Sequence, residues 1–110
     1  MEINKKKNLS VDILEISGKF DRMGSQQAQE TIVSAVLKDG KLIIDLADCD
    51  YLSSAGLRVL LMAANEAETV NCRMVVTSIQ PVIWEIIVTT GFENVLETYP
   101  SQADALKALA

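Results

Sequence analysis

The chain has 110 residues, 49% hydrophobic and 23% charged, as expected of one folded domain rather than a disordered segment. Its 10 basic and 15 acidic side chains give a formal net charge of -5, which argues against nucleic acid or an anionic membrane as a partner. Histidine is absent, which removes the usual general base and the commonest metal ligand, so most enzyme functions are disfavoured and a metal site would have to use carboxylates alone. We expect no enzyme activity, no metal and no cofactor.

The first half of the chain predicts two strands, a helix and a third strand. The two strands cover residues 2–7 and 10–20, and the second has mostly alternating apolar residues with Gly18 marking its end. The segment of residues 24–40 predicts a helix, with Ser25 as its N-cap and Gly40 just beyond its C-terminus. Residues 41–49 form a nearly continuous apolar run, which is typical of a strand covered on both faces.

The second half alternates helices and strands. A helix begins at Ser53 and Ser54, a strand covers residues 72–78, and Pro81 opens a third helix that ends before Gly91. A short strand at residues 94–99 and a helix capped by Ser101 close the chain. The order β-β-α-β-α-β-α-β-α indicates an α/β fold, a mixed and mostly parallel sheet of about five strands with about four helices. No linker or repeat interrupts it, so we predict a single domain over residues 1–110.

The cysteines and the lack of membrane signals indicate where in the cell the protein is located. Cys49 and Cys72 form no CxxC pair, the first ten residues lack the apolar core of a secretory signal, and no apolar run approaches the ~20 residues that cross a bilayer. We therefore expect a cytoplasmic protein that does not contact a membrane, with both cysteines buried as small hydrophobic residues.

Two adjacent serines, Ser53 and Ser54, lie at the start of the second predicted helix, and each could have a structural or a functional role. Ser53 fits an N-cap whose oxygen accepts a bond from a first-turn amide, and this structural account is the commoner one for such serines. Gly56, in the same turn, fits close packing against the strand or the close approach of another backbone. Ser54 is not needed as a second cap, so its hydroxyl is available for another role.

A phosphate on Ser54 would be well placed. It would face free helix amides and the positive end of the helix dipole. Arg58, four residues later on the same helical face, could pair with it. The segment has no base of its own, which fits a modified site better than a catalytic one.

At these residues the chain resembles STAS domains, specifically the bacterial anti-sigma-factor antagonists (anti-anti-sigma factors). "DLADCDYLSSAGLRVLL" is similar to the family signature, in which Asp-Ser-Ser/Thr-Gly-Leu starts the same helix. "ISGKFD" resembles the family's turn after the second strand, and "PVIWEIIVTTGF" the helix before the last strand. The resemblance covers essentially the whole chain with the same element order.

The resemblance implies a regulatory switch in transcription by partner exchange. The unmodified antagonist would bind an anti-sigma factor of the serine-kinase type and release sigma, phosphorylation of Ser54 would eject it, and a serine phosphatase would reset it. The contact with the anti-sigma factor would centre on residues that match the family's motifs or flank them: Asp21, Ser53, Ser54, Ala55, Gly56 and Arg58. This chain has Ser53 where many members carry Asp, and Ala55 where they carry Ser or Thr.

Two other classes of function remain to be weighed. Some STAS modules act without phosphorylation, as scaffolds or transporter accessory subunits, and this is the alternative to the switch. An enzyme or nucleotide-binding domain is disfavoured because the chain lacks a P-loop and a G-x-S-x-G elbow.

Several acidic residues have a structural and a functional interpretation. Asp21 matches the turn aspartate that in the family lies near the phosphorylated serine, but it is equally well explained as a residue of the turn or helix start. Asp45 lies on a predicted strand, and Asp48 and Asp50 fall in the loop after it. We expect solvated loop carboxylates there rather than a calcium site.

Trp84 and Val88 lie one turn apart on the third helix, on a face next to its core residues. The usual explanation of such residues is a wider core stripe. Otherwise they form an exposed apolar patch, which would serve as a docking surface or a homodimer contact.

Overall fold

The computed structural model describes residues 1–110 and contains five strands in one sheet. The strands are β1 (Glu2–Asn8), β2 (Val11–Phe20), β3 (Lys41–Leu52), β4 (Arg73–Thr77) and β5 (Thr98–Tyr99), and they lie side by side in that order. β1 pairs with β2 in the antiparallel direction, and the other neighbouring pairs are parallel. The predicted α/β class, element order and mixed sheet are confirmed.

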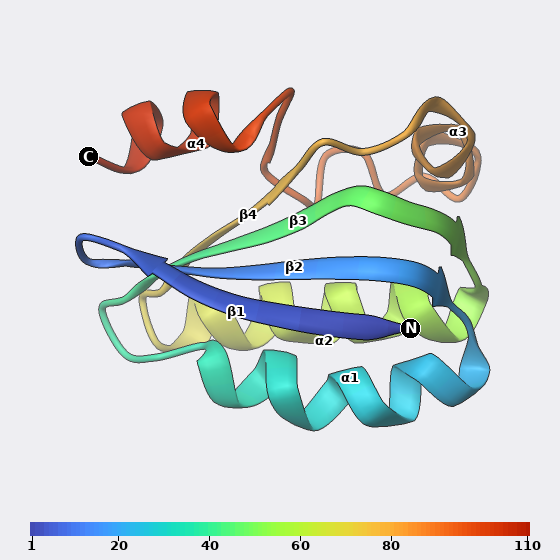
Figure 1. Ribbon diagram of the computed structural model, residues 1–110, viewed down its shortest axis with the longest axis horizontal. Helices are drawn as coiled ribbons and strands as arrows, with labels where there is room; N and C mark the ends of the chain where they lie inside the picture. The colour runs from blue at the N-terminus through green and yellow to red at the C-terminus, as the bar shows by residue number, and fades with distance from the viewer.

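Four helices cover the sheet: α1 (Arg22–Ala35), α2 (Ser54–Thr69), α3 (Pro81–Thr89) and α4 (Gln102–Leu109). In the view of Figure 1, α1 and α2 lie below the sheet, and α3 and α4 lie above it. None of the helices is both long enough and apolar enough to cross a membrane.

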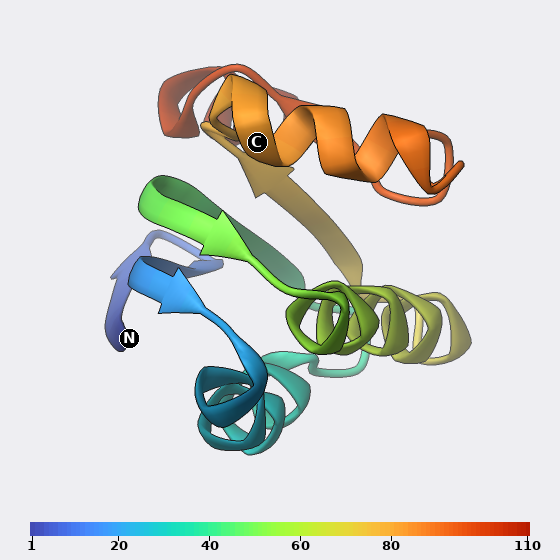
Figure 2. The ribbon, with the colours of Figure 1, turned by 90° about the vertical axis from the view of Figure 1, so that its right-hand side faces the viewer.

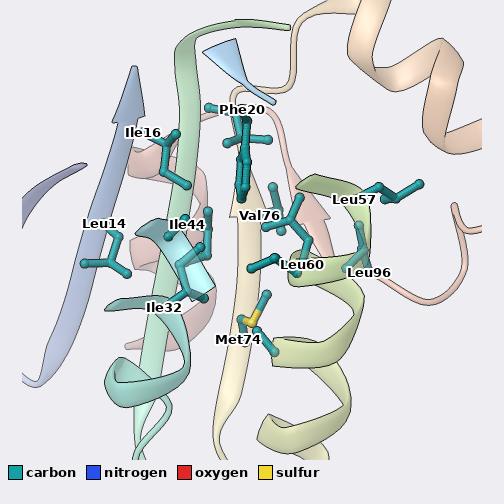
Figure 3. Close-up of a cluster of buried hydrophobic side chains, with 14 of the residues drawn as sticks. Leu14, Ile16, Phe20, Ile32, Ile44, Leu57, Leu60, Met74, Val76 and Leu96 are labelled. Atoms are coloured by element: carbon teal, nitrogen blue, oxygen red, sulfur yellow. The ribbon is translucent and has the colours of Figure 1, made fainter. Parts of the chain in front are cut away.

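The core consists of two clusters of buried side chains. The larger cluster joins β2, β3 and β4 to α1 and α2, as Figure 3 shows for Leu14, Ile32, Ile44 and Leu60, and it also includes Ile83 and Ile87 of α3. A smaller cluster lies under α4 and includes Ile43 from β3. Residues 42–46 of β3 are all buried, so the prediction of a strand covered on both faces is confirmed.

The boundaries of α1 differ from the prediction. Asp21, not Ser25, is the N-cap, because its carboxylate accepts a hydrogen bond from the N–H of Gly24 at 2.8 Å. Ser25 is buried inside the first turns, where its hydroxyl donates to the carbonyl oxygen of Arg22. The helix also ends at Ala35, well before Gly40, since the backbone at Val36 is already extended.

Three strand details also differ. β2 ends at Phe20, as the predicted range 10–20 has it, but Gly18 does not mark that end; it lies inside the strand with a φ of +85°, next to an irregularity in the pairing with β3. β3 does not stop at Cys49, because its last residues pair with the end of β2. β5 is only two residues long, because the preceding residues 92–96 are held in turns, for example by a bond from the N–H of Val95 to the carbonyl of Phe92.

Candidate functional site

The ends of β2 and β3 lie next to each other and lead into α1 and α2 at one edge of the sheet (Figure 2). Phe20 pairs with Leu52 in the last register position of the two strands. The carbonyl oxygen of Phe20 then accepts two bonds from Ser53, from its N–H at 3.0 Å and from its hydroxyl at 3.2 Å. The starts of α1 and α2 are therefore held side by side.

Ser53 is the N-cap of α2, as predicted. Its hydroxyl oxygen accepts from the N–H of Gly56 at 3.1 Å, and its carbonyl oxygen accepts from the N–H of Leu57 at 2.9 Å. A Cβ on Gly56 would lie 2.6 Å from the Phe20 carbonyl oxygen and 2.9 Å from a side-chain carbon of Leu52. The predicted close approach of backbone at Gly56 is thus confirmed, and glycine is required there for steric reasons.

Ser54 is exposed, in the first position of α2. The side-chain hydrogen bonds at the start of α2 are made by Ser53, and the Ser54 hydroxyl has no protein partner. The N–H groups of Ser54 and of half-buried Ala55 are also left without a protein acceptor. A free hydroxyl beside free amides and the positive end of a helix dipole is a suitable place for a phosphate group.

Arg58 is exposed one turn after Ser54. It takes part in none of the three ion pairs of the molecule, which join Lys6 to Glu15, Lys7 to Asp12 and Arg73 to Glu97. Its guanidinium group is therefore available to an anion on the same helical face. That it pairs with a phosphate on Ser54 stays a prediction.

Asp21 lies directly after Phe20, so it belongs to the same edge of the sheet. Its observed role is structural, since it caps α1 through the N–H of Gly24. The side chain is only half-buried. Its predicted part in a contact with a partner remains a prediction.

Two exposed apolar side chains at this edge were not predicted. Met23 in the first turn of α1 is 82% exposed, and Tyr51 near the end of β3 is 48% exposed. The exposure of Met23 could have been predicted from its position on α1, outside the apolar face of the helix. It was missed because the helix was predicted to begin after Met23. Met23 and Tyr51 are therefore accessible to a partner protein that binds at this edge.

Of the three aspartates of β3, Asp45 lies on the strand as predicted, and Asp48 and Asp50 are solvent-exposed as expected but do not lie in a loop, because β3 continues to Leu52. Asp45 is buried, and its carboxylate accepts from the N–H of Ala47 at 2.8 Å and from the hydroxyl of Thr77 at 3.2 Å. No three acidic or cysteine side chains come together in a way that could hold a metal ion.

Trp84 and Val88 are on the surface, so the interpretation as a wider core stripe is wrong. They are 37% and 43% exposed, while Ile83 and Ile87 supply the buried face of α3. Trp84 lines a shallow hollow of about 540 Å³ together with Tyr99. The exposed patch on α3 is confirmed, and its use as a docking surface or homodimer contact stays a prediction.

The cysteines behave as predicted. Cys49 and Cys72 are free and buried. Burial raises the pKa of both thiols. They therefore carry little thiolate at neutral pH and are unsuited to redox or nucleophilic chemistry.

Comparison with known proteins identifies the family. The model of the STAS domain family matches residues 2–105. BtrV of Bordetella bronchiseptica, whose name describes it as an anti-sigma factor antagonist, is 28% identical over 94 residues, covering 84% of this chain and 81% of BtrV.

Solved structures share the fold at lower sequence identity. An anti-sigma factor antagonist from Mycobacterium paratuberculosis is 24% identical with a TM-score of 0.87, covering 97% of this chain and 92% of that one. The Bacillus cell fate determinant SpoIIAA, in its phosphorylated form, is 14% identical with a TM-score of 0.75, covering 99% of this chain and 100% of that one.

Proposed function

The chain belongs to the STAS domain family, and we propose that it is an anti-sigma-factor antagonist that phosphorylation of Ser54 switches off. The name of BtrV and the likeness to SpoIIAA support the regulatory role. The observation that carries the site assignment is the exposed Ser54 hydroxyl, which makes no hydrogen bond at the start of α2. In this proposal the protein is the substrate of a kinase, not an enzyme, and it works in the cytoplasm.

The surroundings of Ser54 support its role as the phosphoacceptor. A kinase can reach the hydroxyl without unfolding the domain, because the side chain is exposed and Ser53 does the capping. After transfer, the phosphate would lie near the free amides of Ser54 and Ala55 and one turn from the unpaired Arg58. The modified side chain would thus be held in place while the fold is unchanged.

The same geometry explains how phosphorylation would release a partner. The unmodified edge offers the apolar side chains of Met23 and Tyr51, with Ser54 and Arg58 on the neighbouring helix turn. A phosphate adds up to two negative charges, and Asp50 is already exposed on the strand that leads to Ser54. Buried in a contact without compensating positive charge, that dianion costs desolvation and repulsion, so the complex dissociates.

The other predicted contact residues contribute in two ways. Ser53 and Gly56 position the start of α2 against Phe20, and Asp21 caps the start of α1. Ala55 is half-buried and Arg58 exposed, so these two can touch the anti-sigma factor next to Ser54. A serine phosphatase would restore the binding form by hydrolysing the exposed phosphoserine.

Capture from a native cell extract tests the proposal. Immobilised wild-type protein and the Ser54→Ala variant should retain an anti-sigma factor of the serine-kinase type, and the Ser54→Asp variant should not. Adding ATP to the captured complex should place one phosphate on the wild-type bait and none on Ser54→Ala. Capture of the same partner by all three baits, with no phosphate added, would instead support an unmodified scaffold or transporter accessory subunit.

A further inference from the structure

The surface between α1 and α2 is hollowed into a groove of about 760 Å³. Its apolar side chains are Val33 from α1 and Met62 from α2, and Met62 is 38% exposed. Methionine is flexible and polarisable, so it packs against partners of different shape. The groove thus has an adaptable apolar centre that no other part of the chain covers.

The rim of this groove is polar and has unused hydrogen-bonding groups. The side-chain amides of Gln26 and Gln29 on α1 and of Asn65 on α2 line it. Side-chain amides that donate within the molecule belong to other residues, for example Gln80 and Gln102. The rim amides are therefore free to bond a partner.

The charge of the groove is negative. Glu30 and Glu66 line opposite walls, no basic residue lines it, and neither carboxylate takes part in the ion pairs of the molecule. Two unpaired carboxylates flanking an apolar centre are complementary to an apolar stripe that is flanked by positive charges.

We propose that the α1–α2 groove is a docking site for an amphipathic helix of a partner protein, with Lys or Arg on both sides of its apolar stripe. A groove between two helices accepts a third helix by packing of side-chain ridges. From Gln26 to Ser34 the groove follows α1 for about 12 Å, or roughly two turns of a bound helix.

A second copy of this chain does not fit as the occupant. Its helices carry at most one basic residue each: Arg22 in α1, Arg58 in α2, Lys107 in α4 and none in α3. None of them can present positive charge along both sides of an apolar stripe. The partner is therefore a different protein.

This docking site is independent of the phosphorylation switch and goes beyond the proposed function. Met62 is eight residues after Ser54, which places it about 12 Å further along α2. A helix in the groove can bind whether or not Ser54 is modified. Its test therefore needs neither the anti-sigma factor nor ATP.

The test is a titration of the isotope-labelled protein with two synthetic helical peptides, followed by nuclear magnetic resonance at low salt. Both peptides carry the same leucine stripe, and it is flanked by lysine in one and by glutamate in the other. The lysine peptide should shift the amide signals of residues 26–34 and 62–66 and leave those of α3 and α4 unchanged. Shifts centred on another surface, no binding at millimolar peptide, or equal binding of the glutamate peptide would overturn the proposal.

Matched variants make the test specific. Glu30→Gln with Glu66→Gln removes the two groove charges, and Glu68→Gln with Glu85→Gln removes two exposed charges that lie outside it. Both doubles change the formal charge from -5 to -3 (-5 + 2). The groove variant should bind the lysine peptide about fivefold more weakly and the control within about twofold of wild type. Equal weakening by both variants would show a general charge effect and contradict the groove; the spectra without peptide verify that each variant is folded.

Discussion

The Phe20 carbonyl oxygen and Ser53 are joined by two hydrogen bonds, one from the Ser53 N–H at 3.0 Å and one from its hydroxyl at 3.2 Å. The same hydroxyl accepts from the N–H of Gly56. The Ser53 hydroxyl therefore donates a bond to the end of β2 and accepts one from the first turn of α2. Of the two adjacent serines, only Ser54 has a side chain free for a functional role.

Replacing each serine by alanine should separate these roles. Ser53→Ala removes a helix cap and a bond between two elements, so it should lower the free energy of unfolding by about 1–2 kcal/mol. Ser54→Ala removes an exposed hydroxyl without partners and should change it by less than about 0.5 kcal/mol. Urea unfolding of both variants checks this, and a larger loss in Ser54→Ala would reverse the assignment.

Gly56→Ala should damage the same junction by steric overlap. The added Cβ would lie 2.6 Å from the Phe20 carbonyl oxygen, and backbone cannot move away as a flexible side chain would. We expect a loss of about 1–3 kcal/mol in thermal or urea unfolding. The Gly91→Ala variant serves as a comparison. A Cβ at Gly91 would meet no atom within 4 Å, but φ is +82°, so only backbone strain should lower its stability. A Gly56→Ala variant as stable as wild type would mean that the start of α2 is not in close contact with the end of β2.

Local signals in the sequence were enough to predict most of this edge of the sheet. Ser53 as a cap and Gly56 as a close-packed residue both follow from positions within one helical turn. The bonds to Phe20 could not be predicted, because the two residues are 33 positions apart and meet only once β2 and β3 pair. The burial of Asp45 was missed for a similar reason, since its partner Thr77 comes from β4.

The errors in α1 have a different cause. Asp21 and Ser25 are both good N-cap residues, and sequence alone does not decide between them. The choice depends on where β2 ends, and pairing with β3 extends it to Phe20. Placing the cap at Ser25 also hid Met23, whose exposure is apparent only when the helix begins at Arg22.

Glu15 should make the stability of the domain sensitive to acid. Its carboxylate accepts from Gln102 of α4 at 2.7 Å and from Asn4 of β1 at 2.8 Å and pairs with Lys6, which lowers its pKa to about 2 from 4.5. The unfolded chain therefore takes up this proton at a higher pH than the folded chain. Stability from this group is complete above pH 4.5 and is lost as the pH falls towards 2.

Unfolding of wild type and Glu15→Gln between pH 6 and 2 measures this contribution. The variant should lose less stability on acidification, and the difference should be about 1 kcal/mol because the carboxylate is partly exposed. Glu2→Gln is the control: it removes a carboxylate from the outer strand β1 that accepts none of the hydrogen bonds made to Glu15. Identical pH slopes for Glu15→Gln and wild type would contradict the role of Glu15.

Trp84 is the only tryptophan, so its fluorescence reports directly on the α3 patch. With 37% of the side chain exposed, acrylamide should quench it clearly in the isolated protein. If the patch is a contact between copies, quenching should weaken as protein concentration rises, and Val88→Asp should abolish that dependence. Emission that resists acrylamide even in dilute protein would mean that Trp84 is covered.

The affinity of the purified anti-sigma factor for the unmodified protein and for protein carrying phosphoserine at position 54 tests the central claim most directly. Calorimetric titration with each form gives the two dissociation constants. We predict that the phosphoserine form binds at least about 100-fold more weakly, a difference of about 2.7 kcal/mol, because the added charge lies within the contact. Equal dissociation constants for the two forms would contradict the switch.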